Sequence, residues 1–150
     1  GMEPVNWLAP NIAFIMISIP ILWNYVGFYF VILLTGINGI SDEMYEAAAI
    51  DGCSKFKQVF YITLPLLRGV ICTCITLGVT GAIKVFDLAW AIVPKGAPQG
   101  LTHFLGTYMY EQTFTISNYD YGSTIAFLIV IFGVTASWIV SKIIRPDDNL

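Results

Sequence analysis

Charged side chains are scarce in this sequence. Lys and Arg number 7 and Asp and Glu number 10 among 150 residues, so 11% of the chain is charged, whereas ordinary globular domains carry about 25%. A soluble domain needs a polar surface, and 57% of these residues are hydrophobic. The composition therefore excludes a free-standing soluble enzyme, a disordered chain and a nucleic-acid-binding protein with a basic face.

Residue types suited to metal binding are also few. The one histidine, His103, is expected to be an exposed loop residue. Cys53, Cys72 and Cys74 suggest neither a disulfide nor a metal site, because Cys72 and Cys74 point to different faces of a helix and no histidine lies nearby. We interpret all three as small buried hydrophobic residues.

Catalytic patterns are absent from the sequence as well. It contains no Ser/His/Asp arrangement, no phosphate-binding loop and no carboxylate pair at catalytic spacing. We therefore predict no catalytic residue, no metal and no cofactor, and we do not expect this chain to be an enzyme.

Three long segments have no charge at all: Pro4–Ser41, Gly69–Ile83 and Tyr121–Ser141. A membrane-spanning helix needs about 20 apolar residues to cross the hydrocarbon layer. The sequence therefore predicts an all-α, polytopic membrane protein with three spans, at about 11–37, 66–86 and 121–144. The alternative, three buried helices of a soluble bundle, would need charged outer faces that the segments lack.

Details within these segments give further expectations. Residues 5–10, with Trp7, are expected to lie in the membrane interface. Pro20 is expected to kink or locally unwind the first span. Lys84 is expected to lie at the outer end of the second span and to extend its side chain toward water.

The Lys and Arg residues predict the orientation in the cell membrane, because cytoplasmic flanks are enriched in them. The flank after the first span and the flank after the third span lie on the same side, and they hold Lys55, Lys57, Arg68, Lys142 and Arg145. The other side holds only Lys84 and Lys95. We therefore place residues 41–65 and the C-terminus in the cytoplasm. The N-terminus is then outside without a preceding signal, which suggests a fragment or a half-length subunit.

The cytoplasmic segment 41–65 has strong local signals. Ser41 is suited to an N-cap, and Gly52 is a natural C-terminal stop for the helix between them. A second helical piece is expected at about 54–62, and Pro65 is suited to the start of the next helix.

Such ordered signals favour a docking element for a cytoplasmic partner. Met44, Tyr45 and Ala48 are expected to form a modest apolar patch, flanked by Glu46 and Asp51. The alternative, an amphipathic helix lying on lipid headgroups, is disfavoured because acidic residues are repelled by an anionic leaflet.

The same segment resembles a known family. The residues that carry the resemblance to the EAA motif of bacterial ABC-importer permeases are Glu46-Ala47-Ala48, Asp51-Gly52, Phe56, Ile62 and Leu64-Pro65. The fuller sequence is similar to sugar-importer permeases of the maltose and glycerol-phosphate type. Flanking matches at 23–28, 86–87, 94–102, 108–114 and 119–127 extend the resemblance over roughly residues 11–145.

The resemblance implies the C-terminal half of a six-span permease, because this chain has three spans. It implies that the 41–65 segment is a coupling helix that docks on a cytoplasmic ABC ATPase dimer. The coupling residues it implies are Tyr45, Glu46, Ala47, Ala48, Asp51, Gly52, Leu64 and Pro65. It also implies a second permease subunit, identical or different, and an extracellular solute-binding protein. Cys53, where the family usually has Ala, and the 94–98 stretch, where it more often has glycines before proline, leave the solute open.

Polar residues within the spans are candidates for the solute pathway, since polar groups are unfavourable in lipid. The candidates are Asn24, Tyr25, Thr73, Thr76 and Thr80. Each threonine hydroxyl has an alternative role, a hydrogen bond to its own helix backbone. Asn24 has an alternative role in helix–helix contact.

The segment 87–120 is expected to be an extracellular loop. Lys84 and Asp87 are expected to form an ion pair at its start. The resemblance implies a gate and a contact surface for the solute-binding protein, and the alternative is an interfacial aromatic belt. Tyr108, Tyr110 and Phe114 also have the spacing of one amphipathic helix.

Two functional hypotheses remain from different classes. The first is a permease subunit that forms part of a pathway for a sugar or related solute. The alternative is a half-length membrane scaffold that docks an ATPase without forming a pathway. A membrane-embedded enzyme is a third and weaker reading, since no catalytic arrangement is found among the spans.

Overall fold

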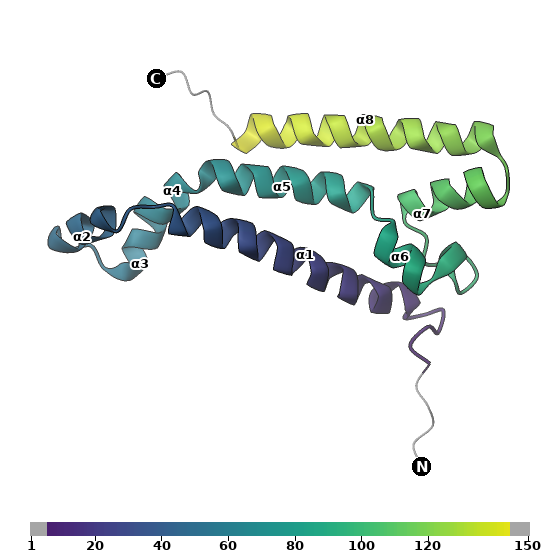
Figure 1. The fold of residues 1–150 in the computed structure, drawn as a ribbon, viewed down its shortest axis with the longest axis horizontal. Coiled ribbons are helices and arrows are strands. Elements are labelled where there is room, and N and C mark those ends of the chain that lie inside the picture. Colours follow the sequence, from purple (N-terminus) through teal and green to yellow (C-terminus); the bar gives the residue numbers. More distant parts are fainter. Residues whose placement is uncertain (1–5, 145–150) are drawn as a thin grey trace, which may run out of the picture.

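Three long helices form the body of the protein. A computed structural model describes residues 6–144, so Val5 and Arg145 of the sequence-based expectations lie outside the described residues. The long helices are α1 (Ala13–Asn38), α5 (Arg68–Ile83) and α8 (Tyr119–Ile144), and α5 lies between the other two (Figure 1). No strand occurs in residues 6–144, which confirms the all-α prediction.

The three predicted spans are confirmed by helix length and apolar composition. The segments Ala13–Asn38, Arg68–Ile92 and Tyr119–Ile143 are each long and apolar enough to cross a membrane. The expected unwinding at Pro20 is wrong, because α1 continues through this residue. A proline in a helix removes one hydrogen bond, and the many remaining bonds of a long apolar helix keep the turn intact.

The second span is a broken helix, which corrects the single helix expected over 66–86. α5 ends at Ile83, residues 84–86 are not helical, and α6 (Asp87–Ile92) continues in the same direction along the molecule (Figure 1). The break lies at mid-height of the bundle. It adjoins Asn24 and Tyr25 in the middle of α1. Lys84 also borders a hollow whose other wall, Ile129–Trp138, is the middle of α8.

The segment 87–120, expected as an extracellular loop, contains short helices, one of them where Tyr108, Tyr110 and Phe114 have the spacing of a helix. After α6 come the 3₁₀ turn η2 (Pro94–Gly96), α7 (Leu105–Tyr110) and the π-helical η3 (Glu111–Thr115). α7 and η3 form one stretch that folds back along the start of α8 (Figure 1). Gly122 permits the close approach, because a Cβ there would collide with the side chain of Thr113.

The hydrophobic core lies at this outer half of the molecule, where α1 packs against the broken helix. Its buried members are Ile17, Ile21, Val85, Ala89 and Val93, with Tyr25 and Phe104 packed against them. The core therefore fixes the position of the break relative to α1.

Candidate functional site

The first candidate site is the hairpin of residues 41–65, which the sequence places between the first and second spans. Its first helix, α2 (Asp42–Ile50), begins after Ser41, whose backbone is extended but whose side chain makes no capping hydrogen bond. Its end is a Schellman motif: the N–H of Cys53 donates to the carbonyl of Ala48 at 2.9 Å, and the N–H of Gly52 donates to that of Ala49 at 3.0 Å. Gly52 has a φ of +76°, which glycine adopts without strain. The predicted stop at Gly52 is confirmed.

Three side chains fix α2 to the chain that follows it. The hydroxyls of Tyr45 and Thr63 are hydrogen-bonded at 2.9 Å. The amide of Gln58 donates to the carbonyls of Tyr45 at 3.2 Å and Cys53 at 3.4 Å. Sequence reasoning missed Gln58, which is 8% exposed. The only sequence feature that could have indicated a buried role is that Gln58 is an uncharged polar residue between Lys57 and the apolar segment that follows.

These contacts divide the predicted apolar patch. Tyr45 and Ala48 are half-buried on the inner side of α2, whereas Met44 is exposed. The outer side of α2 carries Glu46 and Ala47, both exposed, together with Ile50, which is 87% exposed. The hairpin thus has an internal face held by hydrogen bonds and an outward face of mixed acidic and apolar character.

The path from the hairpin into the second span is continuous helix. α3 (Lys55–Gln58) runs into the π-helical η1 (Val59–Thr63), then α4 (Leu64–Leu66), and only Leu67 separates this from α5. Pro65 therefore lies within a helical stretch and does not start one, which corrects the expectation. Its ring is incompatible with a normal bond to the carbonyl of Tyr61. The wider π turn just before it, closed by the N–H of Leu64 on the carbonyl of Val59, provides the accommodation.

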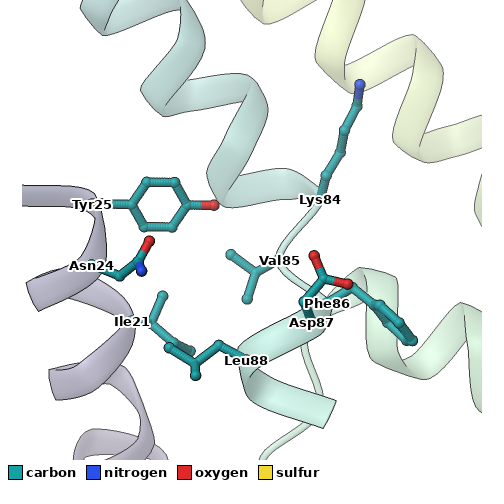
Figure 2. A pocket seen from close by; sticks show the side chains of 8 residues that line it. All are labelled: Ile21, Asn24, Tyr25, Lys84, Val85, Phe86, Asp87 and Leu88. Atoms are coloured by element: carbon teal, nitrogen blue, oxygen red, sulfur yellow. The ribbon is translucent and has the colours of Figure 1, made fainter. Parts of the chain in front are cut away.

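The second candidate site is a hollow at the break between α5 and α6. It has a volume of about 290 Å³ and is lined by Ile21, Asn24, Tyr25, Lys84, Val85, Phe86, Asp87 and Leu88. Figure 2 shows that α1 supplies Ile21, Asn24 and Tyr25 on one side, and residues 84–88 at the break supply the rest. Lys84 is the C-cap of α5 and thus lies at the end of this helix as expected, with the short helix α6 following after the break.

Tyr25 closes the end of α5. Its hydroxyl donates to the carbonyl of Gly81 at 3.3 Å, and the same carbonyl also accepts from the backbone N–H of Lys84 at 3.1 Å. Gly81 also makes room for the ring, since a Cβ there would lie 3.3 Å from Tyr25 atoms.

Lys84 and Asp87 do not form the expected ion pair. Within residues 6–144 their side chains make no ion pair or hydrogen bond, and neither does Asn24. Figure 2 shows the Lys84 ammonium extended away from the Asp87 carboxylate, toward α8. A lysine at the centre of a membrane helix costs about 3 kcal/mol on insertion scales, so such residues face water, a partner or a ligand.

The threonines of α5 are not brought into this hollow. Thr73 donates to the carbonyl of Gly69 at 3.0 Å, and Thr80 donates to that of Thr76 at 2.8 Å. Thr80 instead borders the hollow between Lys84 and the middle of α8. The hydroxyls of Thr73 and Thr80 thus bond to their own helix backbone, which was the alternative reading from sequence.

His103 is not the exposed loop residue that the sequence suggested. Its Nε2 lies 2.7 Å from Oε2 of Glu111, and its side chain is 13% exposed. It packs against Gly96, where a Cβ would collide with the imidazole ring. This contact ties the 94–103 turn to the α7–η3 helix.

The predicted aromatic stripe of the outer segment is also divided. Tyr110 and Phe114 pair, with ring centroids 4.9 Å apart. Tyr108 instead faces Tyr121 on α8, and a side-chain hydrogen bond with Tyr121 raises the pKa of Tyr108 above its ordinary value.

The part of the chain that the structure describes holds no cluster of three metal-ligating side chains. The three cysteines are free; Cys72 and Cys74 are buried as expected, but Cys53 is only half-buried.

Comparison with known proteins places this arrangement in a family. Residues 5–147 match the family described as binding-protein-dependent transport system inner membrane component. A putative ABC transporter permease protein, ORF1, from Caldicellulosiruptor is 37% identical, over 93% of this chain and 99% of its own length. The trehalose/maltose permease protein MalF of Thermococcus litoralis is 34% identical over 97% of this chain, and the sulfoquinovosyl glycerol permease protein SmoG of Agrobacterium fabrum is 31% identical over 99%.

The chain spans 49% of MalF and 48% of SmoG, about half of each. The family match covers nearly the whole chain. The three helices that are long and apolar enough to cross a membrane agree with the family's description as an inner membrane component. The protein is therefore a multi-pass membrane protein that belongs to the family of inner membrane components of binding-protein-dependent transport systems.

Proposed function

We propose that this chain is a permease subunit of an ABC importer for a sugar or related solute, driven by a cytoplasmic ATPase dimer through the 41–65 hairpin. The observation that carries the proposal is the two-sided hairpin. Its inner face is hydrogen-bonded through Tyr45, Gln58 and Thr63, and its outer face, with Glu46 and Ile50, is exposed. A rigid-body push on such a hairpin is transmitted along η1 and α4 into α5.

The roles of the coupling residues follow from this geometry. Glu46, Ala47 and Asp51 are on the exposed side and would contact the ATPase. Tyr45, Ala48 and Gly52 would position the helix, by the hydroxyl bond, the inner packing and the Schellman turn. Leu64 and Pro65 would act at the turn that joins the hairpin to the span.

Two features support the solute class and the orientation. The relatives MalF and SmoG are named for trehalose and maltose and for sulfoquinovosyl glycerol. Lys55 and Lys57 lie on the hairpin, and basic residues favour the cytoplasmic side of the membrane. The hairpin and the C-terminus would then be cytoplasmic, and the outer helices α6 and α7 would face a solute-binding protein.

The remaining partners follow from the exposed apolar surface. Trp23 on α1 is 81% exposed and Phe127 on α8 is 67% exposed. These faces would meet lipid and a second permease subunit, identical or different. Asn24 and Tyr25 would lie along the pathway, with Thr76 and Thr80 beside it and Thr73 held by its own helix.

The docking step is tested by co-purification of the ATPase with membranes that contain this chain. Gly52→Pro should release the ATPase, because proline cannot adopt a φ of +76° and loses the N–H bond to Ala49. Gly52→Asn is the matched control and should retain it, since asparagine tolerates this conformation. Glu46→Lys should also release it, and Asp120→Lys, a charge reversal at the start of α8, should not. Equal recovery with Gly52→Pro and Glu46→Lys would refute the coupling role.

A further inference from the structure

The hairpin divides its charges between its two helices. Its four acidic residues lie on α2 or directly after it, at Asp42, Glu43, Glu46 and Asp51. Its two basic residues, Lys55 and Lys57, lie on α3. Figure 1 shows α2 at the tip of the hairpin and α3 nearer the three long helices. The basic helix therefore lies closer to the membrane-spanning region than the acidic one.

The stretch formed by α3 and η1 carries aromatic rings on the side that faces away from α2. Gln58 is buried by its hydrogen bonds to α2 and to the turn after it. Phe56 and Phe60 lie two positions before and after Gln58, which places both on the opposite side of the helix. Their rings are exposed, with centroids 5.0 Å apart, and the adjacent Tyr61 is 77% exposed. These rings contribute little to the packing of the hairpin.

The two lysines of α3 lie among these rings and are available to a partner. Both side chains are exposed, and within residues 6–144 neither Lys55 nor Lys57 makes an ion pair. We call the surface of Lys55, Phe56, Lys57, Phe60 and Tyr61 the basic-aromatic face. Aromatic side chains are enriched where membrane meets water, and lysines near a membrane attract anionic headgroups.

The position of the basic-aromatic face fits the headgroup layer. η1 and α4 join α3 to α5, and the second apolar span begins at Arg68. Tyr61 precedes Arg68 by about two helical turns, which is about 10 Å. The headgroup layer outside the hydrocarbon is about 5–8 Å thick, and long side chains extend toward their preferred layer. The rings and ammonium groups can thus reach this layer.

We propose that the basic-aromatic face binds anionic phospholipid headgroups of the adjacent leaflet. The ammonium groups of Lys55 and Lys57 would donate to lipid phosphates, and the rings would lie between the headgroups. This contact would hold α3 on the membrane while the acidic α2, which anionic lipid repels, projects away from it. The proposal goes beyond the proposed function, because it assigns a lipid-binding surface to the hairpin. The competing occupants of the face are the ATPase and the second permease subunit.

Quenching of a fluorophore by labelled lipids tests this assignment. Tyr61→Cys is introduced into a chain whose three native cysteines are replaced by alanine, and the new thiol carries the fluorophore. The complete importer is placed in phosphatidylcholine nanodiscs that contain nitroxide-labelled phosphatidylglycerol or, at the same fraction, equally labelled phosphatidylcholine. We expect the anionic lipid to associate at least about fivefold more strongly, the factor for one lysine near an anionic surface. Ile50→Cys, on the outward face of α2, should be quenched by neither lipid.

Charge variants test the cause of this preference. Lys55→Gln combined with Lys57→Gln should make the two lipids quench the Tyr61→Cys fluorophore equally. Lys95→Gln, on η2 at the other end of the molecule, should leave the preference for phosphatidylglycerol unchanged. Equal quenching by both lipids before any lysine is changed would overturn the proposal.

An aqueous quencher separates the competing occupants. If iodide but neither lipid quenches the Tyr61→Cys fluorophore in the complete importer, the face lies in water. If none of the three quenches it, protein covers the face, and either result overturns the proposal. A nanodisc offers the same lipid on both faces, so the outcome does not depend on the orientation of the hairpin in the cell. Release of the ATPase by Gly52→Pro is measured separately, so the proposed function can fail while the lipid contact holds, and the reverse.

Discussion

Gln58 orders the 41–65 hairpin through a single buried amide. Its Nε2 donates to the carbonyl of Tyr45 in α2 and to that of Cys53 in the turn before α3, so one side chain ties α2 and the turn to α3. Gln58→Met keeps the shape and removes both bonds, at a cost of about 1–3 kcal/mol. Backbone amides of α2 should then exchange hydrogen about 5–150-fold faster, since each step of about 1.4 kcal/mol is a factor of ten. Lys57→Met, on an exposed neighbour, should leave that exchange unchanged, and equal exchange in both variants would refute this role.

Gly106 lets α7 lie against the backbone of the break. A Cβ at this position would approach the carbonyl oxygen of Val85 to 2.8 Å. Gly106→Ala must therefore displace α7 or the break, and overpacking of this kind costs about 1–3 kcal/mol. Thermal unfolding of the purified protein should shift to lower temperature. Gly27→Ala is the matched control, because nothing lies within 4 Å of a Cβ there, and a midpoint that falls equally in both variants would count against the close contact.

At the scale of elements, local signals predicted some parts well. The end of α2 was predictable because it depends on the backbone conformation of Gly52 alone, with no contact from distant residues. The three spans were predictable because each is a long segment without charged residues. The sequence did not predict that a second short helix, α6, follows the break after α5. A lysine that interrupts an apolar segment gives the same sequence pattern whether the helix ends there or resumes beyond it. The depth of the break is set by contacts with α1 and α8, which lie far away in sequence. The spacing of Tyr108, Tyr110 and Phe114 indicated the α7–η3 helix, but not where it packs, because the glycines that let it pack, Gly106 and Gly122, contact neighbours distant in the chain.

The π turn before Pro65 sets the rotation of the hairpin relative to α5. Pro65→Ala restores an N–H that can bond to the carbonyl of Tyr61, so η1 can relax to a normal helix. The outward face of α2 would then rotate relative to α5. We expect ATPase stimulation by the loaded binding protein to fall severalfold while the protein still folds. Pro10→Ala, before α1, should have no such effect, and full stimulation with Pro65→Ala would show that the turn is not needed for coupling.

At the scale of the whole molecule, two sites lie at different heights of one bundle. The hairpin lies at one end of the bundle (Figure 1), and the hollow with Lys84 and Asp87 lies at the far end of α5, which joins the two. A movement of the hairpin reaches the break through this one helix. The bundle is open, since Trp23 and Phe127 on its two flanking helices are exposed. Coupling between ATPase and solute would therefore run along the length of the second span.

The most direct measurement is ATP-dependent solute uptake by proteoliposomes that contain this chain with a second permease subunit, the ATPase and the binding protein. The account predicts accumulation of a sugar in the wild-type complex, driven by ATP, and its loss with Gly52→Pro. A complex that assembles and hydrolyses ATP in response to the loaded binding protein, yet accumulates no solute, would contradict the account. That result would assign the chain to the scaffold role.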